Sequence, residues 1–162
     1  MLHDHPVDQV ARALQLAYSY LDRRERTTGE VRRYLLGKDF DAAVTEHSIA
    51  ALLEEGLLDD LRFARLFTTA KRELEQWGAE RIRRALLQRG VEPETIAAAL
   101  DMGADGNVYD DELGRALELL QRRFAAPPRS RRDRDRALGV LVRKGYLPEI
   151  ALDALAAYAR ES

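Results

Sequence analysis

The chain has 162 residues, of which 46% are hydrophobic and 33% are charged. A chain of this length and composition can bury a hydrophobic core, either as one domain or as a row of small repeats. The sequence contains no cysteine, which excludes disulfides, thiolate zinc sites and cysteine nucleophiles. Its 26 basic and 28 acidic side chains nearly cancel, so contact with nucleic acid would have to come from a local basic patch.

The N-terminal stretch MLHDHPVDQV carries acids and histidines where a secretory signal would carry a basic segment followed by an apolar one. No run of the sequence approaches the roughly 20 apolar residues of a membrane span. We therefore expect a cytoplasmic protein that makes no contact with a membrane.

The dominance of Ala, Leu, Arg and Glu, with apolar residues at spacings of three and four, predicts an all-α protein. The segment RRYLLGKDF at 32–40 returns as RRALLQRGV at 83–91, a shift of 51 residues, and more weakly as LGVLVRKGY at 138–146. Short helices that cannot bury their own faces often occur in such repeats. The sequence therefore predicts tandem three-helix repeats, with three domains at 7–56, 57–102 and 108–161. Helices are expected at 8–25, 28–38, 42–55, 60–76, 79–89, 93–101, 110–124, 134–144 and 148–160.

The ends of the predicted middle helices carry recognisable turn chemistry. Thr27 and Glu30 have the spacing of a capping box, in which each side chain accepts a backbone N–H that the helix leaves unpaired. Each middle helix ends with a basic residue, a glycine in two of the three copies, and an apolar residue. That pattern is typical of a left-handed helix stop. Asp39 takes the place of glycine in the first copy, so a positive φ is predicted there. Linkers are expected at 102–107 (MGADGN) and 125–132 (AAPPRSRR).

The adjacent acids Asp59 and Asp60 raise the question of a catalytic or metal site. No further ligand or base lies nearby in sequence except the distant His47. We favour instead an N-cap at Asp59, with Leu58 and Phe63 packed against each other at the entry of the helix. Three acids are left to face either solvent or a basic patch on a partner: Glu54, Glu55 and Asp60.

The remaining polar motifs do not indicate an enzyme. His3 and His5 lie near the terminus, and His47 lies inside a predicted helix, so no metal site is expected from them. No phosphate-binding glycine loop, metalloprotease motif or nucleophile elbow is present. We therefore predict no catalytic residue, metal or cofactor. Trp77 is expected to plug a core rather than to stack on a nucleic-acid base.

Arginines cluster on the middle helices and again between Arg122 and Arg136. One interpretation is a solvated helix face whose charges pair with local acids. The other is a basic stripe, repeated along the array, that follows an anionic partner or a phosphate backbone.

Three ordered segments, YLDRRERTTGEVRRYLLGKDF, LEEGLLDDLRFARLF and WGAERIRRALLQRGV, resemble the RecX family of bacterial recombination regulators. The resemblance covers nearly the whole chain and is strongest from about residue 18 to 100. It implies a curved, elongated array of three-helix repeats that lodges as a monomer in the groove of the RecA–DNA filament. There it would restrain filament growth, ATP hydrolysis, strand exchange and co-protease activity, and so act in DNA repair, homologous recombination and the SOS response.

The candidate binding residues are the basic side chains of the middle helices. They are Arg32, Arg33, Arg81, Arg83, Arg84, Arg143 and Lys144. The third unit lacks the paired arginines of its middle helix, so the three units are not expected to contribute equally. The alternative function is a helical-repeat protein that binds single- or double-stranded DNA through these middle helices, which resemble helix-turn-helix geometry in outline.

Overall fold

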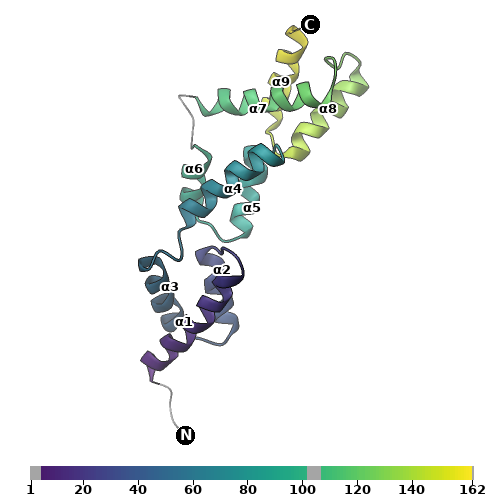
Figure 1. Ribbon diagram of the computed structural model, residues 1–162. Helices are drawn as coiled ribbons and strands as arrows, with labels where there is room; N and C mark the ends of the chain where they lie inside the picture. Colours follow the sequence, from purple (N-terminus) through teal and green to yellow (C-terminus); the bar gives the residue numbers. More distant parts are fainter. Residues whose placement is uncertain (1–4, 102–106, 162) are drawn as a thin grey trace. The chain divides into compact units, whose positions relative to one another are not determined.

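The computed structural model describes residues 5–101 and 107–161, which form nine α-helices and no strand (Figure 1). The first three are α1 (Pro6–Arg23), α2 (Thr28–Gly37) and α3 (Ala42–Glu54). The next three are α4 (Asp60–Leu74), α5 (Ala79–Gln88) and α6 (Pro93–Leu100). The last three are α7 (Val108–Arg123), α8 (Arg131–Lys144) and α9 (Pro148–Arg160). The all-α class and the nine helices predicted from the sequence are confirmed. His3 and nearly all of the predicted linker at 102–107 lie outside the described residues.

The helix bounds agree with the predicted ranges to within three residues, and the largest difference at a helix start is at α8. This helix begins at Arg131 rather than at 134 because the Ser130 side chain accepts the N–H of Asp133 (3.1 Å) and caps the helix earlier. Residues 131–132, which were predicted to belong to the linker, therefore lie in the first turn of α8. With 14 residues, α8 is longer than α2 and α5, which have 10 each.

The predicted turn chemistry is present. Thr27 and Glu30 form both hydrogen bonds of the capping box, at 3.1 and 3.0 Å. Asp39, Gly90 and Gly145 have φ angles of 68°, 83° and 103°, so all three middle helices are followed by a left-handed residue. The positive φ predicted at Asp39 is confirmed.

The Asp59 cap is also confirmed, since the Asp59 carboxylate accepts the N–H of Arg62 at 3.1 Å and α4 begins at the following residue. Leu58 is 3% exposed and packs into a core with Ile49 and Leu52. The contact between Leu58 and Phe63 stays a prediction.

Contacts divide the chain into two compact units. Unit 1 holds the described residues up to Ala64 together with Leu86–Ile96, and unit 2 holds Arg65–Ala85 together with the described residues from Ala97 onward. Each helix of the second repeat is therefore shared between the two units. The three repeat domains predicted from the sequence are a different division of the chain, and their boundaries stay a prediction.

The core of unit 1 lies among α1, α2 and α3 (Figure 1). Ala13 and Ala17 are fully buried on α1, and small side chains there let neighbouring helices approach closely. Val31 and Leu35 bury the inner face of α2. Their packing leaves the other face of α2 exposed, which is the face that carries the candidate arginines.

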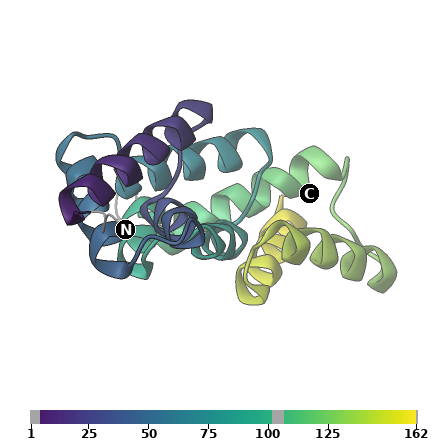
Figure 2. The same ribbon diagram turned by 90° about the horizontal axis from the view of Figure 1, so that it is seen from below.

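The C-terminal core of unit 2 lies among α7, α8 and α9, which pack together in both views (Figures 1 and 2). Leu120 and Leu141 are fully buried, as are Ala151 and Ala154 on α9. The Tyr158 hydroxyl donates to the carbonyl of Phe124 at 2.6 Å, which gives this otherwise buried polar group a partner. The inner face of α9 is thereby committed to the core.

Within unit 1, the start of α2 meets the turn after α5, and we name this contact the first joint. Thr27 donates its hydroxyl to the carbonyl of Arg89, and a Cβ on Gly29 would lie only 2.8 Å from the carbonyl oxygen of Gly90. Asp60 accepts the N–H and the hydroxyl of Thr28 at 2.8 and 3.1 Å. An acid at the start of α4 thus caps the earlier helix α2.

Within unit 2, the start of α5 meets the turn after α8 in the same way, which we name the second joint. The N–H groups of Gly78 and Glu80 donate to the carbonyls of Lys144 and Gly145 at 2.7 and 3.0 Å. Glu112, at the start of α7, accepts the N–H of Ala79 at 2.7 Å. The capping of one middle helix by an acid of the following repeat therefore occurs twice in the chain.

Candidate partner-binding surface

The middle helices α2, α5 and α8 present the same pattern of buried and exposed aliphatic side chains. Leu35, Leu86 and Leu141 are fully buried. The residue that follows each of them is exposed: Leu36 by 45%, Leu87 by 45% and Val142 by 41%. Each middle helix thus displays one aliphatic side chain at an equivalent position. The sequence repeat contained this signal, because the Leu pair recurs in RRYLL and RRALL, but the residues predicted to bind a partner were all basic.

The first arginine of each RR pair is neutralised within its own repeat. Arg32 donates through Nε and Nη2 to both carboxylate oxygens of Glu46, at 2.5 and 3.3 Å. This pairing lowers the pKa of Glu46, because a hydrogen-bonded guanidinium favours the charged carboxylate. Arg83 likewise forms an ion pair with Glu80 one turn earlier on α5. Both arginines therefore already have a carboxylate partner.

The second arginine of each pair has no carboxylate partner among the described residues. Arg33 is exposed on α2 and Arg84 is exposed on α5, where Arg84 donates only weakly to the Glu80 carbonyl at 3.4 Å. Arg33 precedes Leu36 by three residues, and Arg84 precedes Leu87 by the same spacing. Residues three apart lie on one helix face. The two helices thus present an exposed arginine beside an exposed leucine in the same register.

The other three candidates lie at the second joint. Arg81 donates to the carbonyl of Arg143 at 3.2 Å, and Lys144 donates to the carbonyl of Glu75 at 2.8 Å. Arg143 itself is exposed. The structure therefore brings Arg81, Arg143 and Lys144 together in unit 2, where Arg81 and Lys144 satisfy backbone carbonyls at helix ends.

The structure shows the surroundings of the three acids, Glu54, Glu55 and Asp60, to which the sequence assigned no role. Asp60 caps α2 as part of the first joint. Glu55 accepts the Tyr18 hydroxyl at 3.0 Å, and this hydrogen bond is the main reason why the pKa of Tyr18 is raised. Glu54 is exposed. The capping role of Asp60 toward the preceding repeat was missed, since a cap 32 residues away leaves no local signal in the sequence.

Trp77 is half-buried rather than enclosed in a core. Its ring packs edge-on against Phe67, with centroids 6.2 Å apart, and two cations lie over it. The guanidinium of Arg81 is 4.2 Å from the ring centroid and the ammonium of Lys71 is 4.6 Å from it. Such cation–π contacts favour a positioning role for Trp77 in unit 2 over a free stacking platform.

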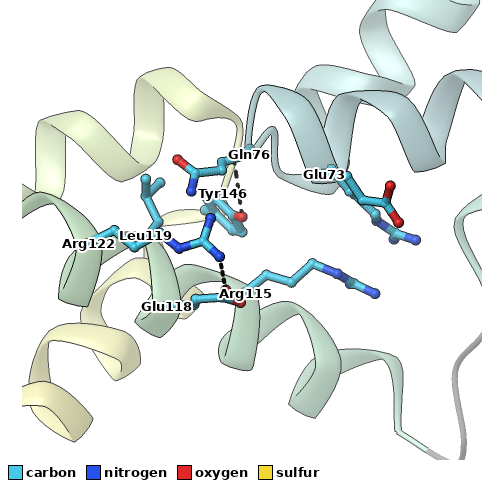
Figure 3. A pocket seen from close by; sticks show the side chains of 8 residues that line it. Glu73, Gln76, Arg115, Glu118, Leu119, Arg122 and Tyr146 are labelled. Atoms are coloured by element: carbon cyan, nitrogen blue, oxygen red, sulfur yellow. Dashed lines mark hydrogen bonds and ion pairs between the residues drawn. The ribbon is translucent and has the colours of Figure 1, made fainter.

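Unit 2 also contains a pocket of about 380 Å³ between α4, α7 and Tyr146 (Figure 3). Figure 3 shows Arg122 and Glu118 paired beside Tyr146, while Arg115 extends toward the side where Glu73 lies. The Tyr146 hydroxyl donates to the Gln76 carbonyl at 3.4 Å, and burial raises the pKa of Tyr146, so the phenol stays protonated. The lining thus combines the Arg122–Glu118 ion pair with the charged side chains of Glu73 and Arg115.

Arg72 also lines this pocket and is half-buried. Its Nη2 donates to the Leu100 carbonyl at 3.0 Å. Burial and then the nearby charge of Arg115 lower the pKa of Arg72, although a guanidinium stays charged at neutral pH. Its hydrogen bond to Leu100 satisfies the C-terminus of α6, which gives the arginine a structural role.

Across residues 5–101 and 107–161, no three side chains of His, Asp or Glu converge as metal ligands would. In the same residues no helix is both long and apolar enough to cross a bilayer. The described surface carries exposed arginines and exposed aliphatic residues, and some of its acids, such as Glu46 and Glu80, form ion pairs.

A chain of three-helix units with repeated exposed side chains defines a class, the helical-repeat protein. Comparison with known families places the chain within that class. Residues 13–52 match the first three-helix domain of RecX, and residues 59–100 match the second three-helix domain. The regulatory protein RecX of Trichlorobacter lovleyi is 34% identical over 151 residues, which cover 91% of this chain and 93% of that protein. The chain therefore belongs to the RecX family, whose members are regulatory proteins rather than enzymes.

Two further comparisons agree. The regulatory protein RecX of Halalkalibacterium halodurans is 39% identical over 93 residues, which cover 57% of this chain but only 35% of that longer relative. The crystal structure of RecX from Lactobacillus salivarius matches with a TM-score of 0.79 at 19% identity, over 96% of this chain and 99% of that chain. This structural likeness establishes the shared fold.

Proposed function

We propose that this protein modulates RecA, mainly as an inhibitor. It binds as a monomer in the groove of the RecA–DNA filament in the bacterial cytoplasm. There it restrains filament extension, ATP hydrolysis, strand exchange and co-protease activity. Membership of the RecX family supports this proposal.

The observation that carries the proposal is the recurrence of an exposed arginine three residues before an exposed leucine. Arg33 and Leu36 form this pair on α2, and Arg84 and Leu87 form it on α5. Arginine beside an apolar anchor is typical of protein interfaces, where the guanidinium finds a carboxylate and the aliphatic group fills a pocket. A filament repeats its surface, so two weak contacts on one chain can add their binding energies.

The candidate residues then divide into three groups. Arg33 and Arg84 make the main contacts with RecA. Arg32 and Arg83 contribute through pairs that Glu46 and Glu80 already neutralise. Arg81, Arg143 and Lys144 contribute from the second joint, near Val142, because the third repeat has Gly139 where the others have Arg33 and Arg84.

The DNA-binding alternative draws less support from the same geometry. Phosphate attraction depends on unneutralised cations. On α2 and α5 the ion pairs of Arg32 and Arg83 remove part of that charge, and the net charge of the chain is −2. Direct contact with DNA is therefore a secondary contribution to filament binding in this proposal.

The test is the single-strand-dependent ATPase and strand-exchange activity of RecA with this protein titrated in. We expect inhibition by the native chain, and a loss of potency of about tenfold or more for the double variant Arg33→Glu/Arg84→Glu, because charge reversal at an interface creates repulsion. The matched control is Arg123→Glu, an exposed arginine on α7 outside the middle helices, which should inhibit like the native chain.

No inhibition by the native chain at amounts well above RecA would remove the proposal. Equal loss of potency in Arg123→Glu would mean that general charge, rather than the arginine and leucine pairs, drives binding. The DNA alternative is measured by the slope of affinity for DNA against salt, which should fall by about one unit for each phosphate that the variant no longer neutralises. An unchanged slope in the double variant assigns Arg33 and Arg84 to protein contacts.

A further inference from the structure

Unit 2 contains a groove of about 540 Å³ between α8 and α9, and its lining includes none of the arginine and leucine pairs described above. The α8 side is lined by Arg131, Arg134, Asp135 and Leu138, at spacings of three and four residues. The α9 side is lined by Leu152, Leu155, Ala156 and Ala159, at the same spacings. Each set occupies one face of its helix, so the two stripes face each other across the groove.

The floor of this groove is apolar and continues the core. Leu138 and Leu155 pack partly buried against the core of α7, α8 and α9. Leu152, at the edge of the groove, is 55% exposed, which is high for a leucine beside a core. The opposite face of α9 is already used, because Ala151, Ala154 and Tyr158 are buried in the core. The apolar stripe that α9 presents to the groove is therefore not used by the core and can contact another molecule.

The rim of the groove is basic. Among the described residues neither Arg131 nor Arg134 has a carboxylate within ion-pair distance, and Asp135 is the one acid in the lining. Both arginines lie in the first turns of α8, where positive charge is unfavourable beside the positive end of the helix dipole. These cations do not stabilise α8. An anionic partner would supply the missing carboxylates and would also offset the unfavourable interaction of the two arginines with the helix dipole.

The start of α8 differs from the starts of the other middle helices. This helix begins at Arg131, three residues before the position equivalent to Thr28 of α2 and Ala79 of α5, so Arg131 lies on an extension and Arg134 takes the place of Thr28 and Ala79. The third repeat therefore lacks the arginine pair of the other middle helices but carries two groove-lining arginines at the start of α8.

We propose that the α8–α9 groove binds an amphipathic, acidic helical segment of a partner protein. Its aliphatic side chains lie on Leu138, Leu152 and Leu155, and its flanking carboxylates pair with Arg131 and Arg134. An amphipathic helix presents apolar anchors at the three- and four-residue spacings that both walls of the groove display. A nucleic-acid backbone would use the arginines but would leave the leucine floor exposed to water, so the apolar floor favours a protein partner.

The experiment measures binding of fluorescein-labelled peptides to the full chain by fluorescence anisotropy. The first probe is a helical peptide with leucines at three- and four-residue spacing and glutamates elsewhere. The second keeps the leucines and replaces every glutamate by lysine, and a single-stranded oligonucleotide is the competitor. We expect binding of the acidic peptide only. Its Kd should rise by about tenfold or more in Leu152→Glu and in Arg134→Glu, as for truncated interface anchors.

The matched control is Arg132→Glu, which reverses an exposed charge in the same helical turn outside the groove lining and should change the Kd by less than about twofold. Leu152, Arg132 and Arg134 are all exposed, so these variants should retain the fold, which circular dichroism verifies. The proposal is overturned if the lysine peptide binds as tightly as the glutamate peptide or if Arg132→Glu weakens binding as much as Arg134→Glu. It is also overturned if the oligonucleotide displaces the peptide and binds independently of Leu152. RecA inhibition is a separate measurement, and the groove can fail while the proposed function holds.

Discussion

Positions 27 and 78 are equivalent in the repeat, and each donates a hydrogen bond to a carbonyl at the end of the next middle helix. Thr27 uses its hydroxyl toward Arg89, whereas Gly78 uses its backbone N–H toward Lys144 at 2.7 Å. The first joint adds a two-pronged ion pair between Arg89 and Glu30, at 2.9 and 3.3 Å, and the Arg89 guanidinium lies 4.4 Å from the Phe63 ring centroid. In unit 1 this joint thus adds charged side chains to the close approach of Gly29 and Gly90.

In unit 2 the equivalent contact is built mainly from backbone. Two N–H to C=O hydrogen bonds cross the second joint. A Cβ on Gly78 would lie 2.6 Å from the carbonyl of Gly145, and a Cβ on Gly145 would lie 2.4 Å from the Cβ of Arg81, so neither glycine has room for a side chain. Side-chain pairs weaken with salt or pH, whereas backbone contacts at glycine fail through steric overlap. A repeat can therefore preserve a contact while the chemistry of that contact changes, and the two joints should respond to different perturbations.

Substitution at the joint glycines should have the largest effect. A Cβ on Gly145 would lie 2.4 Å from the Cβ of Arg81, at a φ of 103°, so Gly145→Ala should cost about 3 kcal/mol of unfolding free energy. In Gly90→Ala the nearest atom, the Gly29 Cα, would be 3.0 Å away, and about 2 kcal/mol is expected. Urea unfolding measures both losses, with Trp77 fluorescence reporting on unit 2.

The control for this pair is Gly114→Ala on α7. A Cβ there meets no atom within 4 Å, so the change should stabilise the helix by about 0.5–1 kcal/mol. Equal losses for Gly145→Ala and Gly90→Ala would contradict the greater steric tightness of the second joint.

Removal of the acids that cap the preceding middle helix should have an intermediate effect. Glu112 is 4% exposed and is the side-chain acceptor for the Ala79 N–H, so Glu112→Ala should cost about 2 kcal/mol by leaving a desolvated donor unpaired. Asp60 is half-buried, and Asp60→Ala should cost about 1 kcal/mol. Thermal unfolding followed by circular dichroism measures both.

An exposed acid in the first turn of α7 provides the comparison. Asp110→Ala, two residues from Glu112, should stay within about 0.5 kcal/mol of the native chain. A loss as large as that of Glu112→Ala would assign the effect to helix α7 itself rather than to the cap on α5.

The smallest effect should be the pH response of the first joint. Burial opposes the charge of Glu30, but hydrogen bonds from Arg89 and the Thr27 N–H, together with the Arg89 charge, outweigh it and lower the Glu30 pKa below its usual 4.5. A lowered folded-state pKa contributes stability that is present above 4.5 and lost as the pH falls through the lower folded value. Glu30→Gln should therefore be less stable than the native chain by about 1 kcal/mol at pH 7, and the two should converge in acid.

The measurement is urea unfolding at pH 7 and at pH 3, followed by circular dichroism. Glu94→Gln, an exposed acid on α6, is the control and should match the native chain at both values. A Glu30→Gln deficit as large at pH 3 as at pH 7 would show that packing rather than charge supplies the stability of this pair.

The sequence predicted the features that depend on neighbours within one helical turn. The capping box at Thr27, the left-handed stop at Asp39 and the cap at Asp59 were all correct, because each involves groups that local geometry brings together whatever the rest of the chain does. The ion-pair partners of the candidate arginines could not be predicted in this way. Sequence spacing placed Arg32 and Arg33 together, but the partner of Arg32 is Glu46, which only the packing of α2 on α3 brings near.

The same limit applies to the acids and to α8. Asp60 was left without a role because its partner Thr28 is 32 residues away. The groove between α8 and α9 could not be predicted, since it requires the relative placement of two helix faces as well as the early cap at Ser130.

Period, helix positions and family were therefore determined by the sequence alone, because hydrophobic spacing and helix-end chemistry are local properties that survive in any arrangement of the helices. Which charged side chains stay unpaired at the surface depends instead on the packing of the helices. Ion pairs, distant caps and grooves arise from residues far apart in the chain, and their distances are set by how the helix faces pack.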